Sequence, residues 1–204
     1  MSESKNKWIC TEEKTLVRSP FMEIIQRECK SSEDNRTHRF FLFKSRDWCN
    51  IIPITADGKV VLVKQFRIGV SEHTLEIPGG VVDPADTDIQ TAAIREMAEE
   101  TGYVPLPHAR CIPLGWTHPN PAIQDNRCHL FVVGPVQKQK NQSLDPGEMI
   151  EVSEVPIEEF LKNLTQSEIT HALILNAFLL LLLKAPETLS ILSRELEGFR
   201  GNHP

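Results

Sequence analysis

The sequence predicts an α/β fold in which helices cover a β-sheet. Two hydrophobic, strand-like runs flank an Asp-Gly turn within residues 49–66, a pattern typical of a β-hairpin. A run of good helix formers covers residues 89–101 and is followed by Gly102, as at the end of a helix. Strand-like and helix-like segments continue to alternate up to residue 184. Interspersed strands and helices favour a layered architecture of sheet and helices.

The first part of the chain carries mainly strand predictions. Residues 1–50 are charged, contain short aromatic runs and lack a helical period, so we expect short strands and connections there. The runs CNIIPIT and KVVLVKQF predict two strands joined at Asp57-Gly58. Beyond them, Gly79-Gly80 marks a point where the backbone needs either a positive φ angle or a close approach to a ligand.

The later elements follow from composition and from capping residues. The helix over residues 89–101 can use either Thr87 or Asp88 as its N-cap. The runs CHLFVVG and MIEVSEVP predict two further strands. The run IEEFLKNL and residues 167–184 predict helices.

Residues 169–185 form the most hydrophobic stretch of the chain. The stretch is too short to span a membrane and contains His171 and Asn176. It therefore predicts a buried helix and no contact with a membrane. The polar N-terminus, MSESKNKW, lacks the hydrophobic region of a secretory signal, so we expect a cytoplasmic protein.

The charge balance is acidic. The chain has 22 Lys and Arg against 28 Asp and Glu, a formal net charge of −6. Duplex nucleic acid and anionic membranes attract basic surfaces, so we expect neither as a partner. A small anionic ligand remains compatible, because one bound metal ion can reverse the local field. With 40% hydrophobic and 25% charged residues, the composition is that of a globular protein and excludes disorder and coiled coil.

The five cysteines are odd in number and show no Cys-x-x-Cys spacing. This pattern argues against a disulfide framework and against a structural zinc site. We therefore expect buried free thiols in a reducing compartment.

The predicted helix over residues 89–101 carries an unusual placement of acids. At 3.6 residues per turn, Glu96 and Glu100 fall inside the hydrophobic stripe that includes Met97, and Glu99 lies on its flank. Buried carboxylates are costly unless a proton or a cation neutralises them, and clustered oxygen ligands suit Mg²⁺ or Mn²⁺. Arg95, four residues before Glu99, can orient one of the acids. The alternative is an ordinary solvated helix face.

Residues 80–103 resemble the Nudix box, G-x5-E-x7-R-E-U-x-E-E-x-G-U, where U is a bulky hydrophobic residue. The second half of the box is matched at each defined position, by Arg95, Glu96, Met97, Glu99, Glu100, Gly102 and Tyr103. The first half contains one inserted residue. The first glutamate of the box therefore falls on Asp86 when counted forward from Gly80 and on Thr87 when counted backward from Arg95.

The resemblance extends to the ADP-ribose pyrophosphatase branch of the Nudix hydrolases, which cleave nucleoside diphosphate sugars. Four features carry it: Trp8, VLVKQFR at residues 61–67, LEIPGG at residues 75–80 and PGEMIEV at residues 146–152. In sequence order these features span most of the chain.

The resemblance implies a metal site on the predicted helix. Glu96 and Glu100 would ligate Mg²⁺ (or Mn²⁺), helped by Glu99 and by the backbone carbonyl of Gly79. Arg95 and Glu99 are also expected to take part in catalysis, Arg95 by orienting the acids.

The resemblance further implies a catalytic base and a set of substrate contacts. Glu148 matches the catalytic glutamate of the branch, Arg67 would contact the diphosphate, and Trp8 would stack on the base, from the other subunit of a dimer. Glu76 and Asn120 are also expected to bind the substrate. Each of the first three has a structural alternative. Arg67 would be a solvated arginine at a strand end, Trp8 a tryptophan that covers a core edge, and Glu148 an ordinary acid on a surface loop.

One segment departs from the branch. THPNPAIQDNRCHLF occupies the position of a Ser-Pro-Gly-like element in typical members. Its polar side chains can hydrogen-bond a sugar or hold a loop together: Asn120, Gln124, Asp125 and Asn126. This departure makes another nucleotide sugar, such as GDP-mannose, a competitor of ADP-ribose as substrate.

The fold that the resemblance implies is the Nudix α/β/α sandwich with a mixed sheet. Residues 1–48 would form a β-rich segment that makes a homodimer, residues 49–184 the hydrolase domain and residues 185–204 a C-terminal tail. The implied activity is Mg²⁺-dependent cleavage of a nucleoside diphosphate sugar to a nucleoside monophosphate and a sugar phosphate. The alternatives are a housecleaning hydrolase of nucleoside triphosphates or dinucleoside polyphosphates, and a non-catalytic nucleotide-sensing Nudix module.

Overall fold

The computed structural model describes residues 8–164 and 169–185. The chain divides into two compact units, each described here by itself. The smaller unit comprises residues 1–47 and 118–127, and the larger unit comprises residues 48–117 and 128–204. Apart from Ala185, the predicted C-terminal tail lies outside the described residues.

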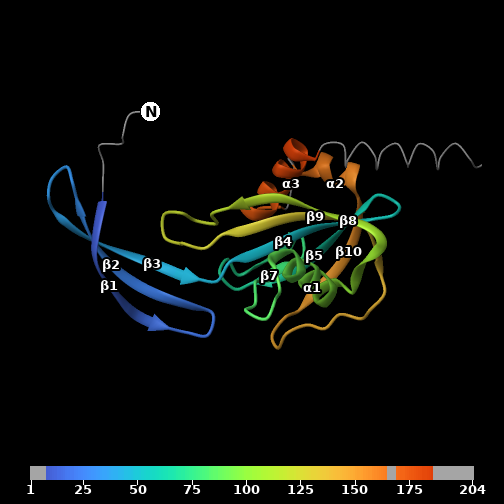
Figure 1. Cartoon of the computed structure of the whole chain (residues 1–204). Helices are drawn as coiled ribbons and strands as arrows, with labels where there is room; N and C mark the ends of the chain where they lie inside the picture. Colours follow the sequence, from blue (N-terminus) through green and yellow to red (C-terminus); the bar gives the residue numbers. More distant parts are fainter. Residues whose placement is uncertain (1–7, 165–168, 186–204) are drawn as a thin grey trace, which may run out of the picture. The chain divides into compact units, whose positions relative to one another are not determined.

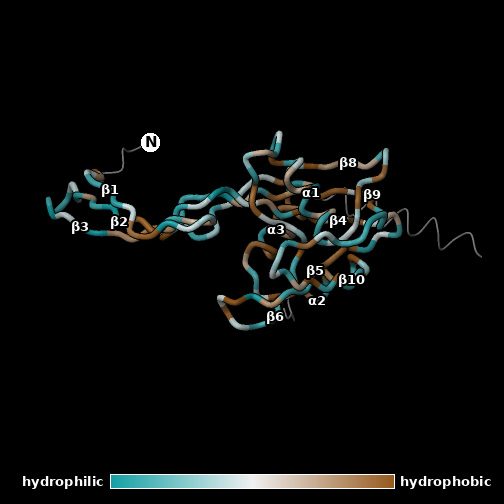
Figure 2. The backbone as a smooth tube through the Cα atoms, turned by 90° about the horizontal axis from the view of Figure 1, so that it is seen from below, coloured by the Kyte–Doolittle hydropathy of each residue, from teal (hydrophilic) through white to brown (hydrophobic). Residues whose placement is uncertain are grey.

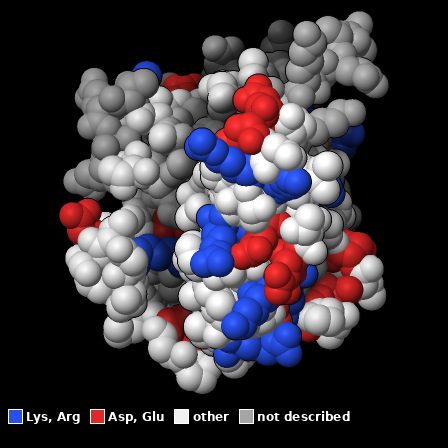
Figure 3. Space-filling model, turned by 90° about the vertical axis from the view of Figure 1, so that its left-hand side faces the viewer, with Lys and Arg blue, Asp and Glu red and all other residues white. Residues whose placement is uncertain are grey.

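The smaller unit contains a three-stranded antiparallel sheet in the order β1-β2-β3. Its strands are β1 (Trp8–Arg18), β2 (Met22–Ser31) and β3 (Thr37–Ser45), which are longer than the short strands predicted. Ion pairs such as Arg27–Glu13 and Arg39–Glu28 cross the strands at 2.8 Å. Basic and acidic side chains accordingly lie beside one another on the surface seen in Figure 3.

Cys10 and Cys29 form a disulfide in this sheet. They are register partners on β1 and β2, so the strand pairing itself brings them together. The prediction of free thiols was therefore wrong for these two residues. Cys49 and Cys128 are free and buried, as predicted, and Cys111 is free and partly buried.

The larger unit is built on a seven-stranded mixed sheet. The main path runs β10-β5-β4-β9-β8, with β6 pairing β5 and β7 pairing β4. β4 and β9 are parallel, whereas the other paired strands are antiparallel. The strands are β4 (Trp48–Thr55), β5 (Lys59–Arg67), β6 (Glu72–Glu76), β7 (Gly79–Val81), β8 (Tyr103–Thr117), β9 (Cys128–Lys138) and β10 (Ile150–Pro156).

Helices cover both faces of this sheet, as Figure 1 shows. They are α1 (Ile89–Thr101), α2 (Ile157–Asn163) and α3 (Ala172–Lys184). Alternate side chains of a strand point to opposite faces, so Ile51 of β4 packs with α1 while Ile52 packs with α2 and α3. The predicted α/β/α sandwich with a mixed sheet is confirmed.

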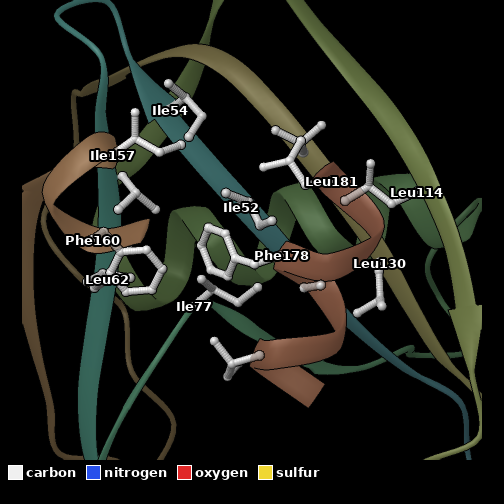
Figure 4. Close-up of a cluster of buried hydrophobic side chains, with 14 of the residues drawn as sticks. Ile52, Ile54, Leu62, Ile77, Leu114, Leu130, Ile157, Phe160, Phe178 and Leu181 are labelled. Atoms are coloured by element: carbon white, nitrogen blue, oxygen red, sulfur yellow. The ribbon is translucent and has the colours of Figure 1, made fainter. Parts of the chain in front are cut away.

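The larger hydrophobic core lies between the sheet and α3. The ring of Phe178 is 1% exposed and points from α3 toward Ile77 and Leu62 (Figure 4). Its centroid lies 4.6 Å from that of Phe160 on α2. Figure 2 shows hydrophobic segments running through the middle of this unit.

The ends of α1 follow from two local signals. The Asp88 carboxylate accepts a hydrogen bond from Thr91 N at 2.8 Å, so Asp88, rather than Thr87, is the N-cap. Gly102 ends the helix with φ 76°, a left-handed conformation that a side chain disfavours.

Two elements differ from the sequence predictions. No strand was predicted over β8, whose prolines interrupt a strand pattern; β8 tolerates them because it lies at the sheet edge. α3 begins at Ala172 and buries only one face, since Leu179 and Leu183 are exposed. Among the described residues no helix has the length and hydrophobicity needed to cross a membrane.

The first prediction concerns the core around Phe178. Phe178→Ala should lower the free energy of unfolding by about 3–5 kcal/mol, because it leaves a large cavity between α3 and the sheet. Leu183→Ala is the matched control on the same helix: Leu183 is 68% exposed, and its change should stay within about 0.5 kcal/mol. Urea denaturation followed by circular dichroism measures both. Equal losses in the two variants would contradict this description of the core.

Candidate active site

Two neighbouring cavities occupy the larger unit. The acidic cavity, about 440 Å³, lies between α1 and the segment before β10, and its lining includes Asp86, Arg95, Glu96, Glu100, Asp145 and Glu148. The neutral cavity, about 520 Å³, lies beside β5, β7 and α3, and its lining includes Asn50, Arg67, Glu76, Gly79, Thr170 and His171. Gly79 and Gly80, here called the Gly79-Gly80 wall, line the neutral cavity, and their main chain lies against Glu100 and Glu96 of the acidic one.

Helix α1 places its acids as the helical periodicity predicted. Glu100 is 4% exposed, and the Glu96 side chain is largely buried. Glu99 lies on the flank and is more exposed. The hydrophobic partners that hold this face against the sheet are Ala92, Ala93 and Met97. The helix therefore presents two buried carboxylates beside the strands, rather than a solvated acidic face.

Burial raises the pKa of Glu100 to about 8. The Gly79 backbone N–H, which donates to Glu100 Oε2 at 2.9 Å, counteracts this shift, and the charges of Glu96 and Glu148 add to it. Burial also raises the pKa of Glu96, although Arg95 opposes the change. Both acids are therefore costly to ionise unless a cation joins them.

Arg95 binds three carboxylates at once. It forms a fork with Asp86, at 3.0 and 2.9 Å, and its Nη1 donates to Glu96 and Glu99 at 2.9 and 2.8 Å. The Thr87 hydroxyl instead contacts Asp88 and Thr91. Of the two positions that counting left open, Asp86 is thus the one that contacts the arginine of the box.

Gly79 and Gly80 permit a close approach and do not have positive φ angles. A Cβ atom on Gly79 would overlap the carbonyl oxygen of Cys49, and one on Gly80 would lie 2.5 Å from Glu96 Cδ. The predicted alternative of a positive φ angle was therefore wrong, and the close approach that is observed involves atoms of the chain itself. The close neighbours are the chain's own strand β4 and a carboxylate of α1.

Glu148 lines the acidic cavity opposite the acids of α1. It closes a turn in which the Glu148 carboxylate accepts from Asp145 N at 2.9 Å. The same segment is attached to the end of α1: Ser143 N donates to Glu99 O at 2.8 Å, and Gln142 Nε2 donates to Glu100 O at 2.7 Å. These backbone contacts bring Glu148, far along the sequence, to the helix.

The donor set of the acidic cavity fits a divalent cation. In the described part of the chain, no three His, Cys, Asp or Glu side chains are already gathered as metal ligands, and Arg95 holds two of the acids. The buried carboxylates of Glu96 and Glu100 nevertheless supply oxygen ligands of the kind that Mg²⁺ and Mn²⁺ prefer. The raised pKa of Glu100 shows that its anion lacks full compensation.

A fork between Arg67 and Glu76 forms the floor of the neutral cavity. Arg67 Nε and Nη2 donate to the two oxygens of Glu76 at 2.7 and 2.6 Å, and the Thr74 hydroxyl donates to Glu76 at 2.6 Å. Burial would raise the pKa of Glu76, which is 1% exposed, but these hydrogen bonds hold it below its ordinary value. Glu76 is therefore an anion that fixes the guanidinium of Arg67.

The predicted site residues are thus distributed over both units. The larger unit brings Arg67, Glu76 and Gly79 to the neutral cavity, and Arg95, Glu96, Glu99, Glu100 and Glu148 to the acidic one. Trp8 and Asn120 belong to the smaller unit. Trp8 packs edge-on against His38 and Phe40, and Asn120 caps a turn through its carbonyl. Their contacts with a substrate stay predictions.

Sequence reasoning did not identify several residues in or next to the two cavities, among them Asp145 and Gln142. Asp145 lies in the same turn as Glu148, and its position directly before the PGEMIEV motif was an available signal. Gln142 acts through backbone contacts that no local pattern reveals. His171, which the sequence placed in the hydrophobic stretch over residues 169–185, lines the neutral cavity at the start of α3.

Known proteins share both the sequence and the fold. The NUDIX domain family matches residues 44–178, more than half of the chain. The chain is 30% identical over 123 residues to an ADP-ribose pyrophosphatase of Bacillus subtilis, covering 60% of this chain and 64% of that protein. It is 39% identical over 64 residues to an ADP-sugar pyrophosphatase of Mus musculus, covering 29% of each.

The crystal structure of an ADP compounds hydrolase superimposes with a TM-score of 0.75 at 19% identity, over 88% of this chain and 95% of that one. At this identity the similarity shows the fold. The chain spans less than two thirds of the length of the first curated relatives. The match to the family nevertheless covers the box, both cavities and most of the sheet, and it confirms the predicted relationship: the chain belongs to the NUDIX domain family.

Proposed function

We propose that the protein is a pyrophosphohydrolase that uses Mg²⁺, or Mn²⁺, to cleave a nucleoside diphosphate sugar such as ADP-ribose or GDP-mannose. The products are a nucleoside monophosphate and a sugar phosphate. The observation that carries the proposal is the acidic cavity, in which Glu148 faces the buried Glu96 and Glu100. Relatives named ADP-ribose pyrophosphatase, in Bacillus subtilis and in Saccharomyces cerevisiae, support the choice of substrate class.

The residues of α1 that line the acidic cavity have distinct roles in this proposal. Glu96 and Glu100 would hold the ion, with help from Glu99 and the Gly79 carbonyl. A bound ion would neutralise the diphosphate and lower the pKa of a water molecule. Arg95 holds Glu96 and Glu99 in place.

The reaction itself requires one proton transfer and one bond exchange. A water oxygen attacks one phosphorus in line as the bond to the bridging oxygen breaks, and that oxygen leaves on a phosphate monoester. Glu148 accepts the proton from the water. Arg67, fixed by Glu76, contacts the diphosphate next to the Gly79-Gly80 wall.

We also propose that the protein is a homodimer formed through the smaller unit. Strand β1 is exposed along its whole length. Large hydrophobic side chains are exposed on the same unit, among them Ile9, Val17, Phe21 and Phe41. A second copy would cover them. A cytoplasmic location stays a prediction, and the Cys10–Cys29 disulfide is unusual for a reducing compartment.

A hydrolysis screen tests the substrate class. ADP-ribose, GDP-mannose, other nucleoside diphosphate sugars, NADH, diadenosine polyphosphates and nucleoside triphosphates are each supplied with Mg²⁺ and with Mn²⁺. The proposal expects the highest kcat/KM for a diphosphate sugar. Preference for triphosphates or dinucleoside polyphosphates would indicate a housecleaning hydrolase, and binding without turnover would indicate a sensing module.

Glu100→Gln keeps the shape of the side chain and removes a charge expected to bind the ion. We expect kcat to fall by at least about a hundredfold, the scale for loss of a principal electrostatic contribution. Near-wild-type turnover at saturating Mg²⁺ would remove Glu100 from the metal site.

The same variant changes the pH dependence of stability. The pKa of Glu100 is about 8 in the folded state, against 4.5 as its ordinary value. With EDTA present, the unfolding free energy of the wild type should therefore fall as the pH rises from 4.5 to about 8. Glu100→Gln should reduce this fall, and urea denaturation at the two ends of the range measures it.

Glu148→Gln and Glu96→Gln separate proton transfer from metal binding. Glu148→Gln should lower kcat by about a hundredfold or more and leave Mn²⁺ affinity within about twofold of the wild type, because the α1 carboxylates remain. Glu96→Gln should weaken Mn²⁺ binding by at least about tenfold. Calorimetric titration of Mn²⁺ distinguishes the two. Equal losses of affinity would make Glu148 a ligand, and full activity of Glu148→Gln would make Glu99 the next candidate base.

Trp8→Ala tests the proposed stacking on the base. Stacking is felt equally in the ground state and the transition state, so KM should rise by about fivefold or more while kcat stays close to the wild type. Leu179→Ala, which removes an exposed hydrophobic side chain of α3 outside both cavities and outside the proposed dimer surface, is the control and should leave KM unchanged. An unchanged KM with a lower melting temperature in Trp8→Ala would make Trp8 a purely structural residue.

A further inference from the structure

His171 lies at the start of α3 with its two ring nitrogens in different environments. Nδ1 accepts a hydrogen bond from Leu173 N at 3.3 Å and caps the helix. A neutral imidazole that accepts at Nδ1 carries its proton on Nε2. Nε2 lies 4.0 Å from Glu76 Oε2, which is longer than a hydrogen bond. The Nε2–H group can therefore donate to a ligand in the neutral cavity.

The charges around this cavity indicate the kind of group that it holds. Among its described lining residues, only Arg67 and Glu76 carry formal charges, and their fork neutralises both. Burial lowers the pKa of His171 below its ordinary value of 6.5, against the opposing charge of Glu76, so the ring is mostly neutral at pH 7. The acidic cavity across the Gly79-Gly80 wall is, by contrast, lined by several carboxylates and one arginine. A neutral group rich in oxygen atoms fits the first cavity better than a second phosphate does.

The shared wall sets the orientation of a diphosphate ester. Gly79 donates its N–H to Glu100 on the acidic side, and the same glycine lines the neutral cavity. A diphosphate bound at this wall with its reacting phosphorus beside the acids would have its ester substituent in the neutral cavity. The substituent then lies near Nε2 of His171 and near Thr170, which also lines this cavity.

We propose that His171 is a specificity-determining residue, whose Nε2–H donates a hydrogen bond to a sugar hydroxyl of the substrate in the neutral cavity. This inference rests on the proposed function, because it assigns the sugar half of the same substrate. It predicts that the protein distinguishes sugars by the position of an oxygen atom at this point of the cavity.

Two substitutions of His171 separate the capping function of Nδ1 from the proposed donor function of Nε2. In His171→Asn, the side-chain oxygen can replace Nδ1 as the helix cap, but no donor reaches the position of Nε2. In His171→Gln, the amide nitrogen can reach the position of Nε2, while the cap is lost. A purely structural histidine and a substrate-binding histidine therefore predict opposite orders for the two variants.

The test measures KM and kcat for the best diphosphate sugar of the screen, together with urea denaturation, on the full chain with Mg²⁺. We expect His171→Asn to raise KM by about fivefold, the loss of one neutral hydrogen bond, with kcat and unfolding free energy near the wild type. His171→Gln should keep KM within about twofold and unfold more easily.

The outcomes separate this inference from the proposed function. An unchanged KM in His171→Asn, or a KM that rises only in His171→Gln together with lost stability, overturns the role of His171 while hydrolysis by the wild type stands. If the wild type hydrolyses no diphosphate sugar, the proposed function and this inference are both overturned.

Discussion

The hydrogen bond from the Gly79 backbone to the buried carboxylate of Glu100 joins strand β7 to helix α1. This contact requires the main chain and the helix to approach more closely than ordinary side chains allow. Glycine at positions 79 and 80 removes the two Cβ atoms that would collide with Cys49 and Glu96. The position of both cavities depends on this approach, because the two glycines line the neutral cavity and lie against Glu100 and Glu96, which line the acidic one.

The close approach has an electrostatic cost that packing must offset. Glu96 and Glu100 repel each other and Glu148, and burial removes the water that would screen them. The opposite contribution comes from the hydrophobic side of α1, where Ala92, Ala93 and Met97 are fully buried against the sheet. The helix can therefore hold unfavourable carboxylates because its core contacts do not depend on them. In the proposed function, this arrangement is the cation-binding site, held within a fold whose stability comes from elsewhere.

Local signals in the sequence predicted α1, its ends and the burial of its acids, since an N-cap, a helical period and a terminal glycine all act within a few residues. Interactions between distant residues escaped prediction. The Cys10–Cys29 disulfide depends on the register of β1 on β2, which no spacing of cysteines reveals. Because of the inserted residue, counting along the box gave both Asp86 and Thr87 as candidates for its first acidic position. Only the contact of Arg95 with Asp86 in the folded chain distinguishes them. β8 was missed because its edge position, which tolerates proline, is a property of the whole sheet.

The contrast between the two cavities bears on the choice among phosphate substrates. A free triphosphate would extend a further charged phosphate from the acids into the neutral cavity, where the Arg67–Glu76 fork offers no net positive charge. Burying that charge without a counterion is costly. A diphosphate ester places its charge at the wall and an uncharged substituent beyond it. For the proposed function, the neutrality that the fork imposes thus favours a sugar ester, and Glu76 would contribute to this selection by holding Arg67 as one half of a neutral pair.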